Sequence, residues 1–162
     1  MKKLLEKQAV FKFVLRFLAF FAQRKAFYHF AIWGTNLTAR LNLLLNRPRP
    51  SSTVVELAES WQQLMPPDGQ DLFPIQSITE DTAYTEIHLH CPLRGSGNVA
   101  ACYRLMNYDR QLMAKVGGQL IVLDSQANSG KNYCRLAIRK QGDDTSDLVP
   151  AHQKTDPSQT ET

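Results

Sequence analysis

The residue types best suited to chemistry gather in one stretch, residues 84–139. It holds two of the four histidines and every cysteine of the chain: His88, His90, Cys91, Cys102 and Cys134. Thiolates and imidazoles act as nucleophiles, bases or ligands of soft metals, so a catalytic or metal site is expected here. No two cysteines form a Cys-x-x-Cys pair, which excludes a zinc ribbon or a thioredoxin-type motif.

The histidines offer the most metal-like short string. His88 and His90 are two residues apart on an expected strand, so their side chains share one face. That spacing suits two imidazoles that hold one metal ion. It equally suits a polar strand face with Glu86 as a neighbour, which is the simpler interpretation.

The cysteines allow a nucleophile. Cys102 lies near the start of an expected helix, where the helix dipole lowers a thiol pKa, and Cys91 is the other candidate. A nucleophile needs a base, and the sequence places neither histidine beside it. The simpler role for each cysteine is a small buried apolar residue. Gly95 and Gly97 precede the same helix but lack the third glycine and the lysine of phosphate-binding loops, so they predict a turn.

Hydrophobic periodicity predicts the elements that position these residues. The expected order is three helices, two strands, one helix over 99–116 and two further strands, with Gly34 separating the first two helices. Short connections between the strands indicate antiparallel pairing. We therefore predict an α+β fold, an antiparallel sheet of about four strands covered by helices and preceded by an N-terminal helical segment.

Three regions differ in composition. Residues 1–46 are an apolar, basic helical segment, and residues 52–140 form the α+β domain. Prolines at 48 and 50 separate the two, because neither can continue a helix. Residues 141–162 are polar and almost without apolar side chains, so they predict a disordered tail.

Charge is distributed unevenly along the chain. Residues 1–50 contain ten lysines or arginines and one acid, whereas the remainder has nine basic and fourteen acidic residues. Arg47 and Arg49 alternate with Pro48 and Pro50, which fits a solvated turn and argues against nucleic acid as a partner. The irregular cysteines indicate reduced thiols and a cytoplasmic location.

The first helix leaves several interpretations open. Its uncharged run, residues 17–22, is too short to span a bilayer. It packs on its own domain, joins two copies in a homodimer, or lies on an anionic membrane surface as a basic amphipathic helix. A secretory signal peptide is the remaining alternative, without a clear cleavage site.

Several large side chains fit either a core or the wall of a small-molecule pocket. They are Trp61, Tyr103, Met106 and Tyr108.

A family resemblance rests on short motifs within residues 84–139. These are Cys102-Tyr103 and Asn107-Tyr108 on the helix, Val122-Leu123-Asp124 on a strand, and Ser129-Gly130 followed by Tyr133-Cys134-Arg135-Leu136. The pattern resembles 4-vinyl-reductase-like domains, which bind small molecules in bacteriochlorophyll biosynthesis and in sensors of aromatic-responsive transcription activators. The resemblance implies a regulatory or ligand-binding domain for an apolar or aromatic molecule.

The same resemblance implies a zinc site in members that bind the metal. Cys102, Asp124 and Cys134 match three ligand positions, whereas the fourth falls near Ala127, which cannot ligate. Cys91 is the available replacement.

A second family provides the enzyme alternative. Cys91-Pro92 and Cys134 are similar to residues of hydrolases that open 2-amino-thiazoline-4-carboxylate. This resemblance implies a cysteine-dependent hydrolase of a small amide or thiazoline-type substrate. A peripheral membrane or protein-interaction module, built on the first helix, is the third expectation for function.

Overall fold

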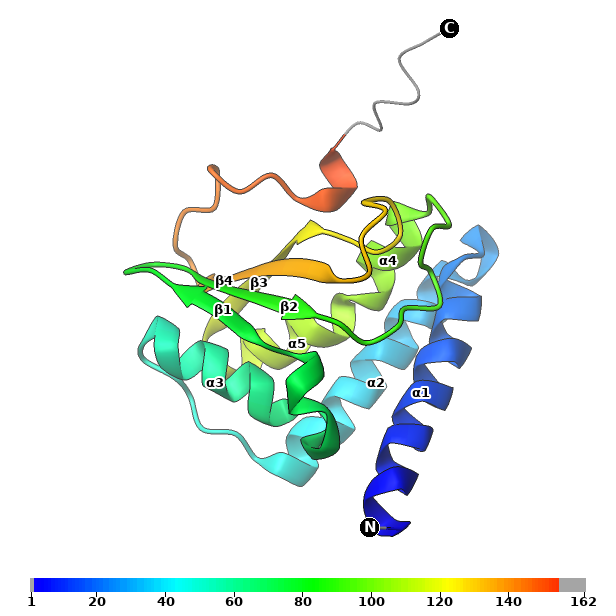
Figure 1. Ribbon diagram of the computed structural model, residues 1–162, viewed down its shortest axis with the longest axis horizontal. Coiled ribbons are helices and arrows are strands. Elements are labelled where there is room, and N and C mark those ends of the chain that lie inside the picture. Colours follow the sequence, from blue (N-terminus) through cyan, green and yellow to red (C-terminus); the bar gives the residue numbers. More distant parts are fainter. Residues whose placement is uncertain (1, 155–162) are drawn as a thin grey trace, which may run out of the picture.

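The computed structural model describes residues 2–154, with side chains from residue 9 onward except that of Asp68. The predicted α+β class is confirmed (Figure 1). The helices are α1 (Lys2–Ala22), α2 (Tyr28–Asn46), α3 (Val54–Leu64), α4 (Val99–Leu105) and α5 (Asn107–Val116), with 3-10 turns η1 (Lys25–Phe27), η2 (Pro67–Leu72) and η3 (Ala151–Gln153). The strands are β1 (Ile75–Ile78), β2 (Ala83–Ile87), β3 (Gly118–Asp124) and β4 (Cys134–Lys140).

The sheet has the order β1-β2-β4-β3, with every neighbouring pair antiparallel. In this register Ile138 lies opposite Ala83 on one side and Leu120 on the other. All three side chains are buried, and their face of the sheet carries the core that α3 and α5 cover. Side chains alternate along β2, so Ala83 and Thr85 point to the buried side of the strand.

Two helix boundaries differ from the prediction. Gly34 does not end a helix but lies inside α2, where a Cβ would come 2.6 Å from Leu18 Cδ2 of α1. Its missing side chain allows the two helices to approach closely, and the chain instead turns at residues 23–24. The helix expected over 99–116 divides at Met106 into α4 and α5.

The N-terminal helical segment belongs to the same packed body as the α+β domain. Arg104 of α4 is buried and donates from Nε to the carbonyl of Ala22, 2.9 Å away, at the end of α1. Asn42 of α2 donates to the Tyr108 hydroxyl at 2.7 Å. Because these bonds join helices far apart in sequence, residues 1–46 and 52–140 are not independent units.

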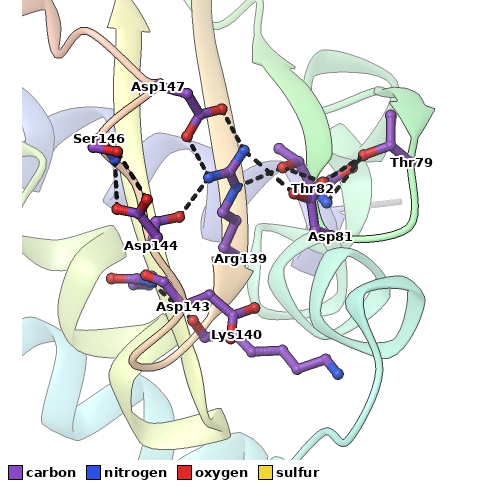
Figure 2. A network of polar contacts seen from close by, with 10 residues as sticks. Thr79, Asp81, Thr82, Arg139, Lys140, Asp143, Asp144, Ser146 and Asp147 are labelled. Atoms are coloured by element: carbon purple, nitrogen blue, oxygen red, sulfur yellow. Dashed lines mark hydrogen bonds and ion pairs between the residues drawn. The ribbon is translucent and has the colours of Figure 1, made fainter.

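Residues 141–154 do not form the predicted tail. They return to the sheet, where Arg139, only 5% exposed, donates to Asp147 Oδ1 at 2.6 Å and to Oδ2 at 2.7 Å (Figure 2). Arg139 Nε also donates to Thr82 Oγ1 at 2.6 Å. Leu148 and Ala151 are buried. The rest of the predicted tail, residues 155–162, lies outside the described residues.

A buried polar pair sits within the core. The Trp61 indole is fully buried and donates from Nε1 to Asp109 Oδ1 at 3.1 Å. Burial raises the pKa of Asp109 to about 6, although the Trp61 hydrogen bond and Arg110 oppose the shift. The carboxyl thus binds its proton more tightly in the folded chain than in the unfolded chain.

The Asp109 pKa predicts a pH-dependent stability. The group stabilises the fold fully below its ordinary pKa of 3.8, and this contribution is lost as the pH rises through about 6. Replacing it by Asp109→Asn keeps an acceptor for Trp61 and removes this titration. We expect the variant to be more stable than the parent chain at neutral pH by about 1–3 kcal/mol. Urea unfolding of both proteins across the acid range checks this; parallel curves would contradict it.

Candidate functional site

A pocket of ≈ 180 Å³ lies where α4, α5 and the edge strand β3 meet the C-terminal segment. Val99 and three β3 residues give it apolar walls. The residues that bring polar or aromatic groups to it are Cys102, Tyr103, Arg110, Ser125 and His152. Elements from three parts of the chain therefore build one site.

Tyr103 contacts both Arg110 and His152 on the charged side of the pocket. The Arg110 guanidinium lies over its ring, 4.0 Å from the centroid, and Arg110 Nη2 donates to the Tyr103 carbonyl at 2.6 Å. The His152 ring lies 4.2 Å from the Tyr103 ring, centroid to centroid. Burial and the nearby Arg110 charge lower the pKa of His152, so its imidazole is neutral at neutral pH. Arg110, which stays protonated, gives the pocket its positive charge.

The cysteine thiols are in their protonated form. Burial, reinforced by the nearby Cys91, raises the pKa of Cys102 to about 11, although Ser125 opposes the shift. Burial also raises the pKa of Cys134 to about 12 and that of Cys91. The expectation that a helix start lowers the Cys102 pKa is wrong, because α4 has seven residues and the thiol is buried among apolar groups. His152, rather than His88 or His90, is the imidazole that shares a pocket with Cys102.

The three cysteines surround the turn that follows β3. Gln126 is buried there; its amide donates to Cys134 Sγ at 3.4 Å, and its side-chain oxygen accepts from the Cys91 amide at 3.2 Å. The Gln126 side chain also donates to the Leu89 carbonyl at 2.8 Å. The sulfur atoms of Cys91 and Cys134 thus accept backbone hydrogen bonds, the first from the Leu93 amide at 3.4 Å, around a turn that joins two loops.

The zinc ligands implied by the resemblance do not assemble into a site. Asp124 pairs with Lys131 Nζ at 3.2 Å and with Lys154 Nζ at 2.9 Å, rather than turning toward Cys102 and Cys134. Within residues 2–154, no group of three His, Cys, Asp or Glu side chains is arranged to hold a metal, with Cys91 included. The donor set therefore does not fit a zinc ion.

The other short motifs are used structurally. His88 Nε2 lies 2.8 Å from Glu86 Oε2 and its ring stacks on Tyr133, and both His88 and His90 are exposed. The amides of Gly95 and Gly97 donate to the carbonyls of residues 126 and 127, each at 2.9 Å. Because these donors are already occupied, the loop does not offer a phosphate cradle.

Of the predicted pocket residues, Tyr103 alone lines the described pocket. Trp61 and Met106 are buried in the core. The Tyr108 hydroxyl accepts the hydrogen bond from Asn42, and burial raises its pKa.

Sequence reasoning missed Arg110, Ser125 and His152. Arg110 lies on the polar side of a helix whose apolar residues received attention. His152 follows Leu148-Val149-Pro150-Ala151, a short apolar island within an otherwise polar tail. That island was the available signal, because Leu148 and Ala151 are the residues by which the segment packs.

The raised thiol pKa values predict that Cys102 and Cys134 are alkylated slowly. At neutral pH we expect iodoacetamide to modify Cys102 and Cys134 much more slowly in the folded chain than in urea, because only the thiolate attacks. Mass spectrometry of tryptic peptides over time measures both rates. Rapid labelling of Cys102 in the folded protein would contradict this expectation and favour a nucleophilic role.

The Arg139–Asp147 pair should hold the pocket wall formed by Pro150, Ala151 and His152. Replacing Asp147→Ala leaves the Arg139 guanidinium without its bidentate partner, so amide hydrogen exchange should accelerate several-fold over residues 144–152. Asp143→Ala is the matched control, because Asp143 contributes its backbone carbonyl to Gln119. Equal exchange in both variants would show that the wall does not depend on this pair.

Comparisons with known proteins leave the family open. No protein-family model, curated protein or solved structure matches the chain significantly. The resemblance to 4-vinyl-reductase-like domains therefore stays a prediction from short motifs. Function is inferred below from the pocket and its charges.

Proposed function

We propose that the chain is a small-molecule-binding domain whose pocket takes a small aromatic or apolar molecule with an anionic group. The observation that carries this proposal is the placement of the Arg110 guanidinium against apolar walls and the ring of Tyr103. Most ligand pockets combine such apolar linings with a few placed polar groups.

The volume supports a ligand of about one ring. A cavity of about 150 Å³ in another protein holds benzene, and this pocket measures ≈ 180 Å³. A single ring with one short substituent would thus fit inside this pocket, which is partly open to solvent. The Tyr103 ring offers a face for stacking at the same place.

The charges support an anionic substituent. Arg110 is permanently positive, while His152 is neutral and the Cys102 thiol is protonated at neutral pH. A carboxylate beside the guanidinium would gain charge-assisted hydrogen bonds in a partly buried setting. The Ser125 hydroxyl, also in the lining, adds a further polar group.

A cysteine-dependent hydrolase is the second candidate, because Cys102 and His152 line the same pocket. The raised thiol pKa weighs against it, since a nucleophile must be available as thiolate. The alkylation rates described above separate the two functions.

The binding proposal is tested with benzoate as the probe and benzamide as its neutral counterpart. Benzoate should bind the parent chain, and Arg110→Met should weaken it by about tenfold or more through loss of charged hydrogen bonds. Arg135→Met is the matched control, since Arg135 lies over Tyr84 and is exposed. Chemical-shift titration, with thermal unfolding as a folding check, gives the affinities.

Equal binding of benzoate and benzamide would overturn the anionic part of the proposal. The same holds if Arg110→Met, folded like the parent chain, binds benzoate unchanged.

A further inference from the structure

Helices α1 and α2 expose a continuous apolar surface. We call it the α1–α2 face and define it by six of its exposed side chains: Phe13, Phe17, Phe20, Trp33, Leu41 and Leu44. Phe13 is 69% exposed, Trp33 58% and Leu44 69%. Soluble monomers rarely expose connected apolar patches of this kind, and such a patch indicates a binding surface.

Aromatic contacts make this face one surface rather than two stripes. Phe13 stacks on Phe17 at 6.5 Å between ring centroids, and Phe17 meets Phe30 of α2 edge-to-face at 6.4 Å. Phe30 in turn lies 5.8 Å from Trp33. The rings therefore connect the two helices along their exposed sides.

The opposite sides of both helices are already occupied. α1 buries Leu18, Ala19 and Ala22, and α2 buries Ala31 and Ala39 against the rest of the molecule. The exposed side chains are thus additional to those that fold the chain. These exposed side chains do not take part in the packing of α1 and α2 against the rest of the molecule.

Charge identifies what the face binds. Residues 9–50 contain seven lysines or arginines and no acidic residue. Lys12 and Arg16 of α1 and Arg40 of α2 are all exposed, and the ion pairs of the described residues lie elsewhere in the molecule. An apolar surface bordered by positive charge complements a bilayer that has anionic headgroups above its hydrocarbon.

A second copy of the chain complements this face less well. A symmetric dimer would place the same surface on itself, so the cations of both copies would face one another. Residues 9–50 supply no acid to pair with these cations, and Asp81 and Asp147 are instead paired with Arg139 at the sheet (Figure 2).

We propose that the α1–α2 face docks the protein on an anionic lipid bilayer, with both helices lying in the headgroup plane. This function is separate from the pocket, which lies at the β3 edge. Trp and Phe are suited to the boundary between headgroups and hydrocarbon. Among the described residues, no helix combines the length and the apolar character needed to cross a membrane, so the proposed docking is on the membrane surface.

The two tryptophans provide a direct readout. Trp33 is exposed on the α1–α2 face, whereas Trp61 is fully buried and hydrogen-bonded to Asp109. Phosphatidylcholine vesicles that contain phosphatidylglycerol should shift the full chain's emission to the blue and protect it from aqueous quencher. Trp33→Phe should abolish the spectral change but retain sedimentation with the vesicles.

Variants divide the apolar contribution from the charge contribution. Phe13→Ser with Phe17→Ser should reduce vesicle partitioning at least tenfold, because each exposed ring loses its burial in the bilayer. Val55→Ser, at a 46% exposed position on α3, is the matched control and should leave it unchanged. Arg16→Gln should weaken binding about fivefold, as expected for one surface charge, whereas Lys115→Gln on α5 should have little effect.

Three outcomes would overturn the proposal. One is binding that is equal with and without phosphatidylglycerol. Another is failure of the full chain to sediment with anionic vesicles. The third is a lipid-free homodimer in which Trp33 is already protected and the double phenylalanine variant becomes monomeric, because the face would then belong to a second copy.

Discussion

The hydrogen bond from the buried Arg104 to the Ala22 carbonyl fixes the arrangement on which the rest of the molecule depends. The last carbonyls of a helix have no partner within it and carry the negative end of its dipole. A guanidinium placed there satisfies the α1 terminus and neutralises its partial charge. Since Arg104 comes from α4, the same bond attaches the N-terminal helices to the domain that carries the pocket.

Burying the Arg104 guanidinium costs free energy unless its N–H groups find partners. A buried guanidinium with one carbonyl acceptor leaves other N–H groups to satisfy, and the Tyr28 ring lies 5.7 Å from its centre. Asn107, three residues after Arg104, donates to Thr35 at 3.0 Å and to Asn36 at 2.8 Å, so polar groups, not only apolar ones, join α2 to α5. Such directional bonds determine the orientation of the helices, which apolar packing alone leaves less specific.

The fold was largely readable from the sequence, whereas the pocket was not. The antiparallel sheet of four strands is found as predicted, because short connections between strands are a local pattern. The alternating burial of residues 83–87 and the Thr53–Glu56 capping box at the start of α3 are local patterns too. The prediction that Gly34 separates two helices was wrong, because a glycine that ends a helix and a glycine that allows two helices to pack closely look identical in sequence. The pocket combines residues 99–125 with 150–152, and no local pattern records that meeting.

The cysteines show a different limit of sequence reasoning. Their spacing resembles a ligand set, and the structure does bring them around one turn. Yet Gln126 occupies the centre of that turn, and Asp124 is paired outward with two lysines. The direction in which each of these side chains points depends on partners far away in the sequence.

The return of residues 141–154 to the sheet has a consequence for where the domain ends. Composition places the boundary at residue 140, the end of β4. A chain shortened there would keep every strand and α-helix and yet lose Asp147 together with Pro150, Ala151 and His152. In such a fragment Arg139 would lose both hydrogen bonds to Asp147 and keep only Thr82 and Asp81 as side-chain partners, and one side of the pocket would stand open to solvent. The last β-strand of the described residues therefore ends at Lys140, whereas the last residue that lines the pocket, His152, comes twelve positions later.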